Sequence, residues 1–224
     1  MGDEIGEWLD EFLKDENSNN NKGFRLVRFD ESYNRKTVDK KTPIILKQYN
    51  PHTGFADGFP ILIISQESLD LLNEKLLQKY KTTKKDLPLE MERFRPNIVI
   101  HTVDDNSKNN AHIEDDWKSI QIGDHTIIHI TVPCSRCSMP CNNMKLGIRD
   151  KAFNEPSDIL QTYRLGSHLG YDTFFHLNPS QWFFGVNAVP TTFTSTPIFV
   201  GDIVTPRSYT PQERSQDIDM ISRT

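Results

Sequence analysis

Hydrophobic residues recur at helical spacing in two long stretches of the chain. The first covers residues 5–13, and the second runs from about Gln66 to Tyr80 with Ser65 as a candidate N-cap. A shorter helix is predicted near residues 157–163. The positions expected to face a core are Ile5, Trp8, Leu9, Phe12 and Leu13 in the first helix, Leu69, Leu72 and Leu76 in the second, and Ile159 and Leu160 in the third.

Runs of β-branched and aromatic residues predict strands between these helices. The predicted strands are 23–29, 61–64, 97–101, 119–122, 125–132 and 197–204. Gly123-Asp124 is expected to join two of them as a tight hairpin. The polar stretches 30–55 and 81–85 are expected to be surface excursions. This order predicts an α+β, mostly β fold, built as a barrel or a sandwich.

Composition excludes several classes of protein. The 224 residues are 36% hydrophobic and 25% charged, and the longest apolar runs are too short to span a bilayer, so no transmembrane segment is expected. The net charge of −5 is carried entirely by residues 1–22, which hold seven acidic residues and two lysines. The remainder is formally neutral, which argues against nucleic-acid binding. Residues 206–224 are polar and spaced by prolines, so a disordered tail is expected there.

The three cysteines lie together at Cys134, Cys137 and Cys141, directly after a predicted strand. An odd number of cysteines in one loop, without a secretory signal, favours metal or thiol chemistry over a disulfide scaffold. Arg136 stands beside Cys137, where its charge would favour the reactive thiolate.

Four interpretations of this loop remain open from the residues alone. Three thiolates with His129 or His125 would form a Cys₃His zinc site. An iron–sulfur cluster would need a further ligand that the sequence does not supply. The others are buried structural thiols without a metal, and a single reactive thiolate in a pocket.

Several segments resemble the MOSC domain, the C-terminal domain of molybdenum cofactor sulfurases. Arg93 to Ile100 reads RFRPNIVI, and Cys134 to Cys137 reads CSRC. Further matching segments are 114–117, 122–124, 163–164, 184–187 and 200–202. The resemblance implies a MOSC-type β-barrel with peripheral helices over residues 58–205.

The upstream residues resemble a particular branch of this family, the mitochondrial amidoxime-reducing components. Residues 8–12 and 24–27 are similar to the segment before the barrel in those proteins. Residues 1–57 are therefore interpreted as a partial N-terminal segment, with an acidic helix, a strand and a polar excursion. By this comparison the chain lacks most of the family's N-terminal β-rich segment, where basic residues contact the pterin phosphate.

The resemblance assigns a molybdenum–molybdopterin cofactor and the residues that hold it. Cys137, the second cysteine of CSRC, would bind the metal and be the catalytic residue. The expected cofactor-binding residues are Gly58, Phe59, Arg95, Asn97, Ser135, Arg136 and Asn187. Gly58-Phe59 stands where the family has Thr-Ser, so only backbone contacts are expected there. An arginine fork suits a phosphate, and amide side chains suit a pterin edge.

Structural roles for the same residues remain open at this point. Arg95 can instead pair with Asp115 or Glu114, and Asn97 or Asn187 can serve a turn or a loop.

The implied activity is that of a molybdenum-dependent oxidoreductase that reduces N-hydroxylated compounds. The resemblance also implies a cytochrome b5-type electron donor with its reductase, and an intracellular location. That location would be mitochondrial as in the relatives, or cytoplasmic if the chain is complete. Two alternatives are a non-catalytic carrier of the cofactor or of sulfur, and a degenerate barrel that binds no molybdenum. The chain is too short to hold the pyridoxal-phosphate desulfurase of the sulfurases.

Overall fold

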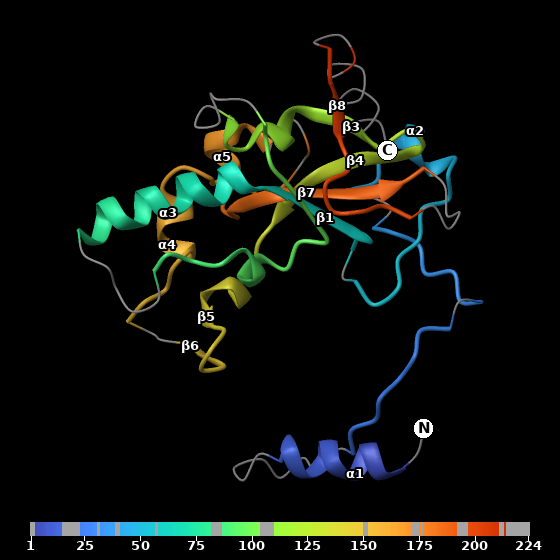
Figure 1. The fold of residues 1–224 in the computed structure, drawn as a ribbon, viewed down its shortest axis with the longest axis vertical. Helices are drawn as coiled ribbons and strands as arrows, with labels where there is room; N and C mark the ends of the chain where they lie inside the picture. Colours follow the sequence, from blue (N-terminus) through green and yellow to red (C-terminus); the bar gives the residue numbers. More distant parts are fainter. Residues whose placement is uncertain are drawn as a thin grey trace. The chain divides into compact units, whose positions relative to one another are not determined.

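A computed structural model of the chain shows a central sheet with helices packed against it (Figure 1). The structure describes residues 3–14, 23–30, 32–38, 41–56, 58–81, 87–103, 110–149, 152–171, 175, 177–191, 197–210 and 213. The chain divides into two compact units, Met1–Asn34 and Arg35–Thr224.

The first unit contains the predicted amphipathic helix, α1 (Asp3–Phe12). Trp8 and Phe12 stack with their ring centroids 5.1 Å apart, and both side chains are largely exposed. The strand predicted over residues 23–29 is wrong, because the structure assigns that segment no strand. The Phe24 N–H instead donates to the Asp10 carboxylate, which also lies 3.5 Å from the Arg25 guanidinium. A carboxylate of α1 therefore accepts a hydrogen bond from the backbone of this segment.

The second unit is organised around a six-stranded sheet with the order β2-β1-β7-β4-β3-β8. Its strands are β1 (Ile61–Ser65), β2 (Ile98–Ile100), β3 (Trp117–Ile122), β4 (Thr126–Ser135), β7 (Phe183–Pro190) and β8 (Val204–Ser208). Only β1 and β2 are parallel, and α3 (Gln66–Tyr80) lies between them in the chain as the crossover that such a pair requires. The predicted hairpin at Gly123-Asp124 joins β3 and β4.

The α+β, mostly β prediction is confirmed, with a curled half-barrel in place of a closed barrel. Among the pairings that the structure describes, the edge strands β2 and β8 do not bond to each other. A separate two-stranded hairpin consists of β5 (Asn142–Asn143) and β6 (Ile148–Arg149). The remaining short elements are α2 (Ile44–Lys47), α4 (Ser157–Gln161), α5 (Gly166–Leu169), η2 (Met91–Phe94), η4 (Ile113–Asp116) and η5 (Met139–Cys141).

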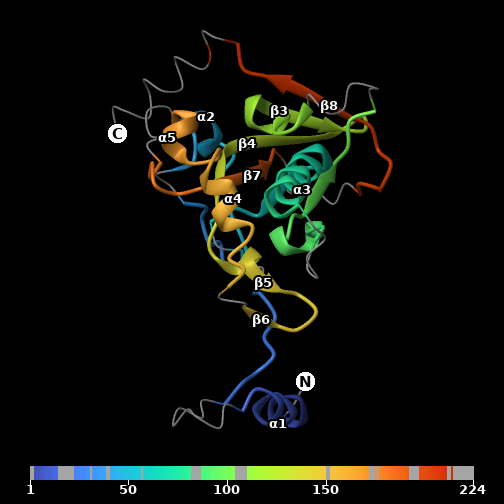
Figure 2. The same cartoon turned by 90° about the vertical axis from the view of Figure 1, so that its left-hand side faces the viewer.

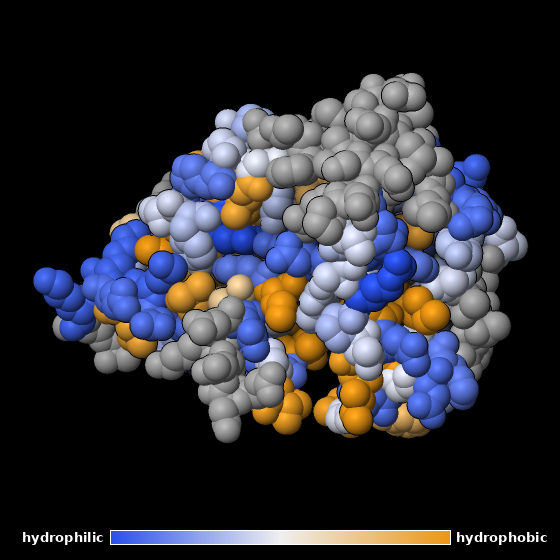
Figure 3. Space-filling view, turned by 90° about the horizontal axis from the view of Figure 1, so that it is seen from above, coloured by the Kyte–Doolittle hydropathy of each residue, from blue (hydrophilic) through white to orange (hydrophobic). Residues whose placement is uncertain are grey.

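Apolar side chains cover both faces of the sheet. Ile64 belongs to the cluster beneath α3, which includes the three predicted leucines of that helix. Ile63 belongs to the cluster on the opposite face, with Ile120, Ile128 and Val186. Helices α3 and α4 lie side by side over the first face (Figure 2). The solvent side of α3 is hydrophilic (Figure 3), which completes its predicted amphipathic pattern.

Strand β7 contains a bulge that breaks the usual alternation of side chains. Phe184 faces the α3 cluster while Val186 faces the opposite one, although residues two apart normally share a face. Gly185, between them, has φ +76°, and the register against β4 shifts there. A Cβ on Gly185 would lie 2.5 Å from Ile64 Cγ1 and 2.6 Å from the Ile63 carbonyl oxygen. Glycine is therefore required by both the backbone and the close approach of β1.

The start of α3 is bonded to a carboxylate that lies far away in sequence. Ser65 occupies the N-cap position, as predicted, but its side chain makes no capping bond to the helix backbone. Its hydroxyl donates to Glu114 Oε2 at 2.7 Å, and the Ser68 hydroxyl donates to Glu114 Oε1 at 3.1 Å. Glu114 is completely buried, and burial raises the pKa of its carboxyl. The sequence could not reveal this pairing of residues 49 positions apart.

The last strand lies later in the chain than predicted. Residues 197–203 form a turn in which the Phe199 N–H donates to Asp202 Oδ2 at 2.8 Å, and the strand begins only at Val204. Residues 206–208, which the sequence assigns to a disordered tail, pair with β3. Most of the stretch 211–224 and of the predicted excursion 81–85 lies outside the described residues.

Candidate functional site

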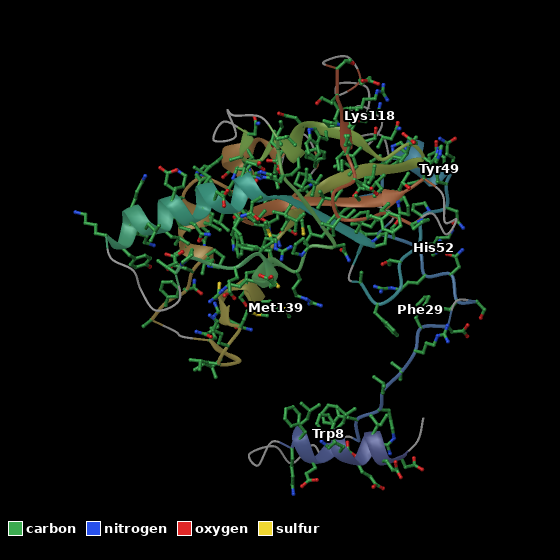
Figure 4. The ribbon with its side chains drawn as sticks, in the orientation of Figure 1. Trp8, Phe29, Tyr49, His52, Lys118 and Met139 are labelled. Atoms are coloured by element: carbon green, nitrogen blue, oxygen red, sulfur yellow. The ribbon has the colours of Figure 1, made fainter. Side chains whose placement is uncertain are left out.

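The end of β4 and the loop after it carry Ser135, Arg136 and Cys137. Cys137 is exposed, and none of the hydrogen bonds recorded in the described parts of the chain involves its thiol. The backbone N–H of Arg136 donates to the Trp182 carbonyl at 3.0 Å, which anchors the loop to the start of β7. Met139, labelled in Figure 4, follows on the same loop. The thiol is therefore presented to solvent from a backbone that is tied to the sheet.

Two of the predicted amides lie beside Leu62, Asn97 directly before β2 and Asn187 within β7. Asn97 Oδ1 accepts a bond from the Leu62 N–H at 2.9 Å, and the Asn97 N–H donates to the Leu62 carbonyl at 2.9 Å. Asn187 lies directly opposite Leu62 in the antiparallel pair, so both side chains occupy the face that α3 covers. Asn187 is half-buried, and its backbone carbonyl accepts a bond from the Thr131 hydroxyl. Asn97 thus has a structural role through its oxygen, while its NH₂ group retains hydrogen-bonding capacity.

Arg95 is exposed at the turn that leads into β2. Its φ of +55° places the residue in the left-handed region, and its Nη1 lies 3.5 Å from Met139 Sδ. The alternative pairing with Asp115 or Glu114 is wrong. Asp115 Oδ2 pairs with Arg164 at 2.7 Å inside the protein, and Glu114 binds the two serines of α3.

Arg136 points into the protein. Its Nη2 donates to the Phe94 carbonyl at 2.6 Å, its Nη1 lies 3.3 Å from Cys134 Sγ, and its guanidinium sits 5.7 Å from the centre of the Phe94 ring. The expectation that this charge activates Cys137 finds no support, because the thiol that Arg136 contacts is that of Cys134.

The remaining predicted contacts lie at the start of β1 and the end of β4. The Phe59 side chain is buried with Leu46, Val132 and Val189, so only its backbone is free to face a ligand. Gly58 is half-exposed, and its carbonyl accepts a bond from Val38. Ser135 pairs with Phe183 of β7 and is half-buried. The predicted set thus comes from segments that pair with or bond to one another across β2, β1, β7 and β4.

The three cysteines enter different environments. Cys141 is buried, its thiol lies 3.6 Å from the Asn154 carbonyl, and burial raises its pKa. His129 stacks on Tyr49 at the opposite end of the sheet from Met139 (Figure 4). Within the described residues, which include every cysteine and both candidate histidines, no group of three metal-binding side chains comes together. The Cys₃His zinc alternative is therefore not supported.

Sequence reasoning missed two contributors to this region. The Phe94 carbonyl accepts a hydrogen bond from Arg136, and the Met139 sulfur contacts the Arg95 guanidinium. A backbone carbonyl carries no signal in a sequence, and a methionine in a loop is not distinctive.

Comparison with known proteins identifies a family over most of the chain. The family model for the MOSC domain matches residues 50–205. Mitochondrial amidoxime reducing component 2 of Rattus norvegicus is 34% identical over 164 residues, and its Homo sapiens counterpart is 31% identical over the same length. Molybdenum cofactor sulfurase of Arabidopsis thaliana is 32% identical over 142 residues.

The matched stretch covers 73% of this chain but only 41% of either amidoxime reducing component. For the sulfurase it covers 62% of this chain and 16% of the relative. No helix in the described parts of the chain combines the length and apolar character needed to cross a membrane.

Proposed function

The chain belongs to the MOSC domain family, and we propose on this premise that it binds a molybdenum–pterin cofactor through Cys137 and reduces N-hydroxylated compounds. The names of the relatives support both parts, since they include amidoxime reducing components and a molybdenum cofactor sulfurase.

The observation that carries the proposal is the exposed, unengaged thiol of Cys137 on an anchored loop. Molybdenum is thiophilic, and a thiolate ligand must be reachable by the incoming metal. Cys141 is buried, and the thiol of Cys134 is contacted by Arg136, so neither offers the same access.

The surrounding donors fit the cofactor chemically. Arg95 is exposed with an uncompensated charge, which suits a phosphate. The NH₂ group of Asn97 and the amide of Asn187 offer donors to a pterin edge, and Ser135 adds a hydroxyl. Gly58 and Phe59 contribute backbone groups. A metal held by one cysteine and a dithiolene needs no cluster of protein ligands.

The residues of the chain would then divide the work as follows. Cys137 ligates the metal, Arg95 neutralises the phosphate, and Asn97 and Asn187 orient the ring system. When bound, the cofactor supplies a metal centre that accepts the N-hydroxyl oxygen and two electrons per turnover. With two protons, the products are the reduced nitrogen compound and water.

Electron supply and location belong to the same proposal. A cytochrome b5-type protein and its reductase would deliver the electrons. Mitochondrial association is proposed because the relatives are named as mitochondrial proteins.

Metal content tests the cofactor assignment directly. Protein made in a molybdenum-replete host and purified without oxygen should contain molybdenum by mass spectrometry. Cys137→Ala should lose nearly all of it, whereas Cys141→Ala should retain it because that thiol is buried. Zinc in place of molybdenum, or molybdenum that persists in Cys137→Ala, would contradict the assignment.

A carrier function is the second candidate, because an exposed thiol also suits transfer of the cofactor or of a persulfide. Reduction of an amidoxime by the loaded protein with a chemical electron donor separates the two. A carrier binds the cofactor, or takes a persulfide on Cys137, without turnover. A reductase converts the substrate repeatedly.

A further inference from the structure

We propose that Arg136 is a positioning residue that holds the Arg95–Asn97 turn and the Cys137 loop together. It acts from inside the protein and does not touch the cofactor. The inference rests on the proposed function in that the two segments it joins carry the metal ligand and the phosphate and pterin contacts. The family resemblance implies a direct contact for this arginine, so the assignment changes its role.

The guanidinium is engaged on three sides by groups of the chain itself. Nη2 donates to the Phe94 carbonyl at 2.6 Å, and Nη1 contacts Cys134 Sγ at 3.3 Å. Its Cζ atom lies 5.7 Å from the centre of the Phe94 ring, within the range of a cation–π contact. Nε is buried without a hydrogen-bond partner in the described residues, so it is out of reach of an external phosphate.

These contacts join two segments that are separated by about forty residues of chain. Phe94 ends η2 and is completely buried, and the next residue is Arg95. Cys134 lies in β4, three residues before Cys137. The Arg136 side chain therefore fixes the spacing between the anchored thiol loop and the turn that presents Arg95 and Asn97.

The chemistry of the link explains why an arginine is suited to it. A guanidinium is planar and directs its donors along separate lines, so one side chain can bond a carbonyl and a sulfur while stacking on a ring. A lysine ammonium is a point charge on a flexible chain and cannot hold all three partners together. Arg95 offers the contrast, since its guanidinium is exposed and contacts only Met139 Sδ among the recorded bonds of the described residues.

A spectroscopic test needs no cofactor. In metal-free protein, arginine side-chain NMR should show a guanidinium with slow solvent exchange and separately resolved Nη protons. This signal should vanish in Arg136→Lys and survive in Arg95→Lys. A rapidly exchanging, averaged guanidinium for Arg136 would overturn the proposal whether or not the protein binds molybdenum.

The positioning role is tested by a double-mutant cycle with molybdenum retention as the readout. Residues that orient metal ligands indirectly change metal affinity by about 10- to 100-fold when removed. Arg136→Ala should therefore release molybdenum about 10- to 100-fold faster than wild type. Arg136 acts partly through Cys134. The substitution Cys134→Ala should therefore accelerate molybdenum release less in the Arg136→Ala variant than in wild type.

The matched cycle uses Arg95, whose expected contact is direct. Arg95→Ala and Cys134→Ala should multiply in their effects on release, since these two side chains do not meet. Arg149→Ala removes an exposed cation that bonds Asn154, and it should release molybdenum at the wild-type rate.

The outcomes separate this inference from the function it builds on. Wild-type protein without molybdenum contradicts the proposed function, and the NMR measurement alone then decides the placement of Arg136. Multiplicative effects of Arg136→Ala and Cys134→Ala, with wild type loaded, would instead favour a direct cofactor contact. If Arg136→Ala does not fold, Arg136→Lys replaces it in the cycle, and Cys134→Ala should again accelerate release by less in that variant than in wild type.

Discussion

His112 shows how strongly burial can govern a single titratable side chain. Its ring lies between Tyr163 and Phe184, with centroids 6.0 Å and 5.7 Å away. Neither ring nitrogen has a hydrogen-bond partner among the described residues. Burial, followed by the charges of Arg164 and Lys75, lowers the pKa of His112 to about 3. The imidazole is therefore neutral at neutral pH.

This burial makes stability depend on pH. Between pH 6.5 and pH 3 the unfolded chain protonates His112 while the folded chain does not, so stability falls as the pH is lowered. From pH 6.5 to pH 5 the loss from this residue is about 2 kcal/mol. Urea unfolding of wild type and His112→Asn at both pH values measures it. Asparagine tolerates the positive φ of +63° at this position, and the variant should lose that part of the pH dependence. An unchanged dependence would contradict the burial argument.

At this scale the sequence predicts which residue types gather but not where their side chains point. The resemblance picks out Cys137 and Arg95, and both are exposed, as a ligand contact requires. It also picks out Arg136 and Phe59, whose side chains turn inward. The direction of Arg136 depends on the Phe94 carbonyl, and that of Phe59 depends on packing against Val132 and Val189. Neither is encoded by neighbours in the chain.

The bulge in β7 lets Phe184 and Val186 pack on opposite faces of the sheet. Gly185→Ala would place a methyl group against Ile64 and the Ile63 carbonyl, in a backbone region that alanine disfavours. Positive φ costs about 1–2 kcal/mol and overpacking about 1–3 kcal/mol, so a loss of about 2–5 kcal/mol is expected in urea unfolding.

Gly123 provides the control for this substitution. It also has positive φ, at +55°, but nothing lies within 4 Å of the position that a Cβ would occupy. Gly123→Ala should therefore cost only about 1–2 kcal/mol, from the backbone alone. Equal losses in the two variants would show that the approach of β1 to Gly185 is not tight.

Elements with a strong local pattern are those that the sequence locates well. The helix predicted from Gln66 to Tyr80 has those bounds, and its three leucines are buried. The last strand was displaced because Phe199 and Asp202 form a turn within an apolar run that resembles a strand. The segment 23–29 has a strand composition but does not form a strand, because composition alone does not determine whether a segment joins a sheet.

For the whole molecule, the division after Asn34 leads to a truncation experiment. Every strand pairing of the sheet and all four clusters of buried apolar residues lie within Arg35–Thr224. A chain of residues 35–224 should therefore unfold at a temperature within a few degrees of the full chain. Calorimetry of both chains measures it. A fall of more than about 10 °C would show that residues 1–34 are part of the cooperative unit, since about 1 kcal/mol shifts Tm by about 2–4 °C at this size.

The fold class could be predicted from the order of helices and strands, but the closure of the sheet could not. Whether β2 and β8 meet depends on how far the sheet curls, which is a property of all six strands together. The boundary at residue 57 stays a prediction, and the family match beginning at residue 50 adds the end of the polar excursion to the matched region.

The hydrogen bonds between Glu114 and the serines at the start of α3 have a consequence for the order of folding. A helix of fifteen residues gains little stability alone, and the serines at its start bond to a carboxylate 49 and 46 positions later in the chain. During synthesis, the serines at the start of α3 therefore cannot form these bonds until β2 and η4 have left the ribosome. We therefore expect α3, β2 and η4 to fold together in one kinetic step.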